Sequence, residues 1–105
     1  GMGCPSRRLA VSHAFHSPLL EPVLGQFREE VSRVQLFAPT VRVVSNVGGV
    51  AAGAGEVSTV EHWVDHMVKP VDFLAGARTL ERCGTRVAVE IGPDAVLSKL
   101  GPQCK

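Results

Sequence analysis

Two histidines lie three residues apart in the segment 11–18, Val-Ser-His-Ala-Phe-His-Ser-Pro, where a short apolar run precedes a helix start. An imidazole titrates near neutral pH, so His13 or His16 could act as a general base if the backbone holds one ring nitrogen and leaves the other open to a ligand. A lone histidine at the end of a strand is also common as a surface or half-buried structural residue. The segment alone leaves both interpretations open.

A second pair of histidines, His62 and His66, is spaced four residues apart in His-Trp-Val-Asp-His. Side chains at this spacing lie on the same face of a helix, so the pair could hold one zinc ion. The segment also resembles the inverted metalloprotease pattern His-x-x-Glu-His, with aspartate in place of glutamate. A third ligand would be needed, and histidines on a solvated helix face are common without metal. We therefore predict no metal site.

Other residues that could do chemistry are poorly placed for it. The chain contains no Gly-x-Ser-x-Gly sequence, so none of its serines lies in a nucleophile elbow. The glycine-rich stretch 48–55 lacks the Lys-Ser/Thr of a phosphate-binding loop, so we predict a flexible loop there. Cys4, Cys83 and Cys104 lie far apart, which fits neither a paired disulfide framework nor a Cys-x-x-Cys metal site, so we expect free thiols.

The composition is that of one small domain. The chain has 105 residues, of which 45% are hydrophobic and 20% charged, with a net charge of +1. This charge balance argues against nucleic-acid binding, and no apolar run reaches the roughly 20 residues of a membrane span. Because no signal segment opens the chain, we expect a cytoplasmic location. Residues 1–7 are predicted to be a flexible arm or tag remnant, and residues 8–105 one domain.

The elements that must position the histidines follow from the apolar periodicity. Residues 8–15, 40–44 and 86–91 are predicted as strands. Ser17 and Pro18 start a helix as N-cap and first helical residue, and because of Pro22 either the helix proper starts near residue 22 or its first turn is loose. That helix carries an apolar stripe of five residues, Leu20, Leu24, Phe27, Val31 and Val34.

Three further helices are predicted. A capping box, Ser58-x-x-Glu61, begins the second helix, and Pro70 ends it. A third helix follows until Gly84 caps it, and Asp94 is the predicted N-cap of a short fourth helix. The order strand, helix, strand, two helices, strand, helix predicts an α/β fold with a short, mainly parallel sheet and helices packed on it.

Four blocks of the sequence, residues 9–22, 43–47, 62–71 and 90–94, resemble in that order the C-terminal part of the acyltransferase domains of modular polyketide synthases. The resemblance runs from about residue 7 to the end, and its most specific signal is His-Ala-Phe-His before Ser-Pro. It implies the C-terminal portion of the large, α/β-hydrolase-like acyltransferase subdomain.

In that family a serine in a Gly-His-Ser-x-Gly elbow takes a malonyl-type group from coenzyme A and passes it to the phosphopantetheine thiol of an acyl carrier protein. The resemblance implies that His16 is the base that activates this serine, with malonyl-CoA as the acyl donor and no bound cofactor. It assigns His13 and Phe15 to the choice of extender unit. Phe15 matches the malonyl-selecting form, because its ring fills the space of an α-methyl group. The main-chain carbonyl of His66 would orient the catalytic imidazole.

The family's serine elbow, its arginine for the malonyl carboxylate and its small ferredoxin-like subdomain match nothing in this chain. The resemblance therefore implies a transferase part that is inactive alone and that works with an N-terminal acyltransferase half and an acyl carrier protein. The alternative is a non-catalytic folded module that associates with itself or with another protein. Because part of the sheet would lack neighbours, we also expect a homo-oligomer.

Overall fold

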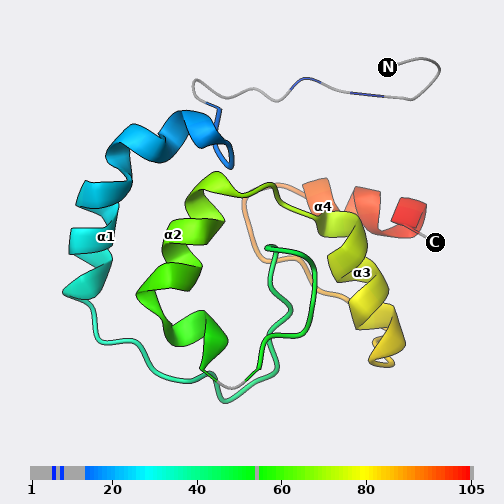
Figure 1. Cartoon of the computed structure of the whole chain (residues 1–105). Helices are drawn as coiled ribbons and strands as arrows, with labels where there is room; N and C mark the ends of the chain where they lie inside the picture. Colours follow the sequence, from blue (N-terminus) through cyan, green and yellow to red (C-terminus); the bar gives the residue numbers. More distant parts are fainter. Residues whose placement is uncertain (1–5, 7, 9–13, 54, 105) are drawn as a thin grey trace.

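The computed structural model describes residues 6, 8, 14–53 and 55–104. These residues form four α-helices and three 3-10 helices: η1 (Pro18–Val23), α1 (Leu24–Ser32), η2 (Glu56–Ser58), α2 (Val60–Val68), α3 (Phe73–Arg82), α4 (Val96–Leu100) and η3 (Gly101–Cys104). Helices α1 and α2 lie side by side, and the chain after α2 leads to α3 and then to α4 at the C-terminal end (Figure 1).

The predicted sheet is not formed by the described residues, so this part of the fold prediction is corrected. Residues 86–91 have no regular secondary structure, and residues 40–44 contribute only an isolated antiparallel bridge from Val44 to Ala51. Most of the predicted strand 8–15 lies outside the described residues. A strand requires a hydrogen-bonded neighbour, and extended backbone without one gains no ladder. Composition and alternation predict the extended segments but cannot supply their neighbours.

The first helix begins as predicted and then changes its geometry. Ser17 Oγ accepts a hydrogen bond from the N–H of Leu19 at 3.3 Å. Pro22 lacks the N–H that an α-helix would direct to the carbonyl of Pro18, so the chain runs as η1 to Val23 and becomes α-helical at Leu24. The result is the loose first turn that the sequence predicts.

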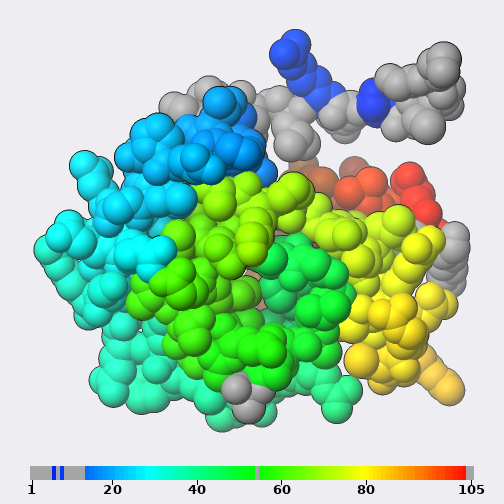
Figure 2. Space-filling view, viewed as in Figure 1, coloured from blue at the N-terminus to red at the C-terminus, as the bar shows by residue number. Residues whose placement is uncertain are grey.

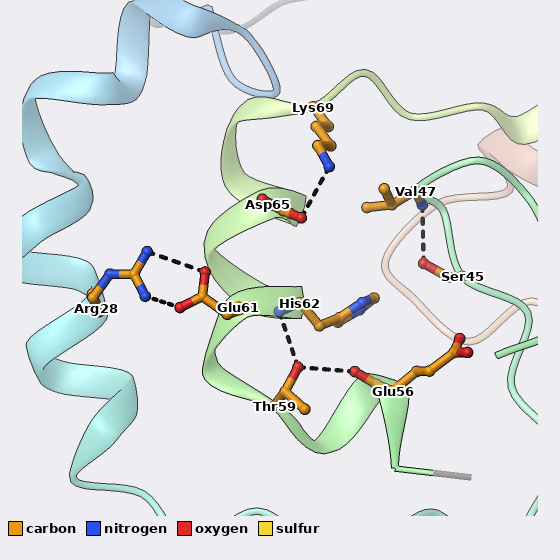
Figure 3. Close-up of polar contacts among 9 residues, drawn as sticks. All are labelled: Arg28, Ser45, Val47, Glu56, Thr59, Glu61, His62, Asp65 and Lys69. Atoms are coloured by element: carbon orange, nitrogen blue, oxygen red, sulfur yellow. Dashed lines mark hydrogen bonds and ion pairs between the residues drawn. The ribbon is translucent and has the colours of Figure 1, made fainter. Parts of the chain in front are cut away.

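Helix α1 packs along α2, and Figure 2 shows the two surfaces in contact. Most of the predicted apolar stripe is half-buried there, at Leu20, Leu24, Phe27 and Val31. Val64 of α2, 4% exposed, is the one large apolar side chain among the described residues that is buried. At the rim, the guanidinium of Arg28 binds the carboxylate of Glu61 through both of its terminal nitrogens (Figure 3). This pair is exposed, so solvent screening leaves it little weight in the stability of the packing.

The caps of α2 and α4 differ from those predicted. Thr59, rather than Ser58, is the N-cap of α2 and accepts from the N–H of His62 at 3.2 Å (Figure 3). At α4 the N-cap residue is Ala95, whose side chain makes no capping bond, and the carboxylate of Glu90 instead accepts from the N–H groups of Leu97 and Ser98. The hydroxyl of Ser98 donates to the same carboxylate, and these bonds lower the pKa of Glu90. Sequence reasoning places Asp94 there because it sees only adjacent residues.

The loop between α1 and α2 is fixed against α3 by close backbone contact. Gly49 adopts a φ of +64°, and a Cβ on it would collide with Ala75 and with the N–H of Gly76. The hydroxyl of Thr79 donates to the carbonyl of Gly49 at 2.6 Å, and the N–H of Asp72 donates to Asn46 at 3.0 Å. The loop therefore lies against α3 over its glycine turn, although the sequence predicts a flexible segment.

In the described part of the chain, no helix combines the length and apolar character needed to cross a membrane.

Replacing Gly49 with alanine is expected to destabilise the chain by at least about 2 kcal/mol, because the variant combines a left-handed backbone with overpacking against α3. The matched control is Gly25→Ala in α1, where a Cβ meets open space and φ is ordinary, and where stability should rise by up to about 1 kcal/mol. Urea unfolding of both variants measures the difference. Equal stability of Gly49→Ala and the unsubstituted chain would contradict the loop packing.

Candidate functional site

The site begins with the way α2 ends. The N–H of Lys69 donates to the carbonyl of Asp65 at 2.8 Å, which is the last bond of the helical pattern. The next bond would run from residue 70 to the carbonyl of His66, but residue 70 is proline and has no N–H. The carbonyl of His66 therefore points beyond the helix end without a donor from its own helix.

His16 supplies the donor that α2 lacks. Its Nδ1 lies 2.7 Å from the carbonyl oxygen of His66, and its backbone N–H donates to the carbonyl of Met67 at 3.1 Å. The side chain and the backbone of one residue thus bind two successive carbonyls at the C-terminus of α2. The hydrogen bond between the imidazole and the His66 carbonyl is the contact that the family resemblance implies.

The backbone at His16 is strained. Its φ is +57°, the one positive value at a non-glycine residue in the described chain. Histidine is among the residues that enter the left-handed region, at a cost of roughly 1 to 3 kcal/mol. The hydroxyl of Ser17 donates back to the carbonyl of Ala14 at 2.5 Å and tightens the turn. The chain therefore leaves the extended conformation at His16.

The imidazole of His16 packs against further rings of α2. The ring of His66 meets it edge-on, with centroids 5.1 Å apart and an interplanar angle of 86°. The rings of His62 and Trp63 continue the cluster, and the indole N–H of Trp63 donates to the carbonyl of Val57 at 3.0 Å. Burial lowers the pKa of His66, and the neighbouring His16 and His62 lower it further. His66 is thus biased toward its neutral form.

This arrangement suits a general base. A carbonyl oxygen can only accept, so Nδ1 of His16 carries the proton and Nε2 holds the free lone pair. The carbonyl of His66 thereby fixes the tautomer and orients the ring. The chemical requirement for a base is met at His16; its catalytic use remains a prediction.

The other predicted site residues have different outcomes. His13 lies outside the described residues, and Phe15 is 55% exposed, so their part in extender choice stays a prediction. The described residues contain no group of three or more histidine, cysteine or acidic side chains that could hold a metal ion. Cys83 is an exposed free thiol.

Two features of the site were not anticipated from the sequence. One is the histidine and tryptophan ring cluster, which needs knowledge of the contact between residue 16 and α2. The other is the reason why the carbonyl of His66 is open to His16, for which the sequence does hold a signal. A proline four residues after His66 removes the amide that the helical pattern would direct at that residue.

No protein-family model matches the chain. Among curated proteins, polyketide synthase GfsB of Streptomyces halstedii is 46% identical over 103 residues, covering 97% of this chain and 2% of GfsB. The phenolphthiocerol synthesis polyketide synthase Pks15/1 of Mycobacterium bovis is 45% identical over 91 residues, covering 87% of this chain and 4% of that protein. The chain therefore spans a small share of the relatives that it matches.

Solved structures give the same picture. The acyltransferase domain of SpnD, in complex with 2-(pent-4-yn-1-yl)malonyl, matches 93% of this chain and 24% of that chain, with a TM-score of 0.87 and 37% identity. Malonyl-CoA:acyl carrier protein transacylase (FabD) from Xanthomonas oryzae matches 91% of this chain and 30% of its own, with a TM-score of 0.80 and 29% identity. The backbone of this chain thus follows one part of a larger acyltransferase domain.

The lowered pKa of His66 predicts acid sensitivity. A histidine with a folded pKa below its unfolded value of 6.5 binds fewer protons in the folded state, so stability is full above pH 6.5 and falls as the pH drops through the folded pKa. His66→Phe keeps a ring and removes this titration. We expect the variant to lose less stability than the unsubstituted chain between pH 6.5 and 5, measured by thermal unfolding. Parallel curves for the two proteins would contradict the burial of His66.

Proposed function

Since this chain belongs to the acyltransferase domains of polyketide synthases, as the C-terminal part of such a domain, we propose that it supplies the general base for transfer of a malonyl group from coenzyme A to an acyl carrier protein. The observation that carries the proposal is the 2.7 Å contact between Nδ1 of His16 and the carbonyl of His66. It leaves Nε2 as the basic nitrogen. The nucleophilic serine comes from an N-terminal acyltransferase half.

In the proposed reaction, Nε2 of His16 takes the proton of the serine hydroxyl as the serine oxygen attacks the thioester carbonyl. The tetrahedral intermediate collapses with cleavage of the carbon–sulfur bond, and the imidazolium returns the proton to the departing coenzyme A thiolate. In the second half, the same base takes the proton of the phosphopantetheine thiol as it attacks the acyl-serine, and then protonates the serine oxygen. His16 ends each transfer in its starting tautomer.

The choice of malonyl over larger extender units is assigned to Phe15 together with His13. An aromatic side chain directly before the base occupies the space that a substituent on the α-carbon would need. Overall likeness does not decide this point, because the SpnD domain, 37% identical, was solved with a malonyl group that carries a pentynyl substituent. The proposal on substrate therefore rests on residue 15 rather than on the fold.

A second candidate is a module that associates with itself or with another protein, and one surface favours it. Val87, Val89 and Ile91 occupy alternate positions and are 80%, 81% and 95% exposed. They border an apolar groove of about 820 Å³ that Leu80 and Leu97 also line. Covering a side chain of this size contributes about 1.5 to 3 kcal/mol. This segment, rather than the α1 stripe that packs on α2, is the surface we propose for homo-oligomer contact.

The catalytic proposal predicts activity only in combination. With labelled malonyl-CoA, the chain alone should take up no label, and a mixture with an N-terminal acyltransferase half and acyl carrier protein should label the carrier. His16→Gln should lower the rate of transfer about 10² to 10⁴-fold, because general base catalysis is lost. His62→Gln, a histidine with no bond to the His66 carbonyl, should retain most of the rate. Label on the chain alone, or full activity of His16→Gln, would contradict the assignment.

The association proposal predicts a species larger than 11.1 kDa in sedimentation equilibrium at micromolar concentration. Val89→Glu places a charge in the centre of the exposed segment and should shift the chain to monomer, because a buried carboxylate without a partner is costly. Val41→Glu, also exposed but outside the groove, is the matched control and should leave the mass unchanged. A monomeric unsubstituted chain would exclude self-association through this surface.

A further inference from the structure

We infer that Pro70 is a positioning residue for His16, because its missing amide reserves the carbonyl of His66 for the imidazole. The inference rests on two hydrogen bonds. One is the last helical bond, from Lys69 to Asp65, and the other is the bond from His16 Nδ1 to the His66 carbonyl. The helical bond that would come next, from the amide of residue 70 to the carbonyl of His66, cannot form because proline has no N–H.

An ordinary residue at position 70 would compete with His16. In a continuing helix, the N–H of residue i+4 lies directly along the carbonyl of residue i, so an amide at position 70 would reach the carbonyl of His66 first. This helical bond from residue 70 to His66 needs no contact between distant segments, whereas the bond from His16 joins residues 50 apart in sequence. Restoring the amide therefore favours the local bond over the long-range one.

Pro70 also acts on the residue before it. Lys69 has φ −80° and ψ 147°, the extended conformation that a following proline favours and that takes the chain out of the helix. Pro70 itself is exposed, so filling of the core does not account for it. The two effects of the pyrrolidine ring, a lost donor and an extended preceding residue, both keep the end of α2 open to His16.

Pro70 affects the chemistry of His16 because it determines which tautomer the imidazole adopts. While the carbonyl of His66 is free, it selects the Nδ1–H form of His16 and leaves Nε2 as the base. If the amide of residue 70 takes that carbonyl, Nδ1 loses its acceptor, and the imidazole returns to the mixture of tautomers that free histidine shows. The ring then has no fixed basic nitrogen.

The catalytic consequence rests on the function proposed for His16, so the test reads the ring rather than the activity. The ¹⁵N chemical shifts of the two ring nitrogens of His16 are recorded at a pH where the imidazoles are neutral, together with the ¹³Cα shifts of residues 69 and 70. In the unsubstituted chain, the ring nitrogens should differ as one tautomer requires. In Pro70→Ala they should move toward the values of free histidine, while residues 69 and 70 move toward helical shifts.

Two further variants make the result decisive. Pro70→Gly restores the amide but is a poor helix former, so its ring shifts should lie between those of the unsubstituted chain and Pro70→Ala; it also serves if the alanine variant does not fold. Pro39→Ala, an exposed proline in the loop after α1, should leave the ring unchanged. Unchanged His16 ring nitrogens in a folded Pro70 variant would overturn the inference, whether or not α2 extends.

The outcomes also separate this inference from the proposed function. If the ring nitrogens shift in Pro70→Ala but His16→Gln keeps its transfer activity, the positioning role stands and the catalytic assignment fails. If the nitrogens do not shift but His16→Gln loses activity, the catalytic assignment stands and Pro70 has only a structural role.

Discussion

The described structure depends on the open C-terminus of α2. One helix end presents the carbonyls of His66 and Met67, and the turn at His16 binds both. This contact joins the segment before η1 to the centre of the molecule and makes a left-handed histidine tolerable. Strain of roughly 1 to 3 kcal/mol at one residue persists only where surrounding contacts determine the conformation. Here two hydrogen bonds made by His16 itself hold its backbone in this conformation.

Little of the remaining surface is covered as completely. Val64 is the one buried large apolar side chain among the described residues, and the large apolar side chains after Thr85 are mostly exposed. A chain with so small a core has a narrow margin of stability, since a small domain must offset a large conformational entropy with apolar burial. The exposure of these apolar residues fits the match to about a quarter of the SpnD domain, because a larger domain would have further surface to pack against them.

The sequence predicted what is local. Each helix was expected in its place because apolar spacing, proline and cap residues act within a few positions, and even the loose turn at Pro22 could be foreseen. The sheet could not, since a strand exists only with a neighbour, and alternation in 86–91 says nothing of whether one is there. The same limit explains the wrong cap predicted for α4. Glu90 binds the first amides of α4 from outside the helix, whereas Asp94 was predicted because it is nearer in sequence. For the site, the resemblance supplied the partner of His16, and the helical pattern supplied the reason why that carbonyl is free.

The identity of the orienting group has an electrostatic consequence. A carboxylate in this position would stabilise the imidazolium strongly but would itself need desolvation, whereas a carbonyl at a helix C-terminus brings partial negative charge without a buried ion. Because the carbonyl stabilises an imidazolium only modestly, a second positive charge nearby would offset that stabilisation. A protonated His66, with its ring centroid 5.1 Å from that of His16, would oppose the imidazolium by about 3 kcal/mol at an effective dielectric constant of about 20. Burial of His66 lowers its pKa and keeps this second charge away. His66 thus orients the imidazole of His16 through its carbonyl while its own ring is biased toward the neutral form, and both follow from the packing of α2.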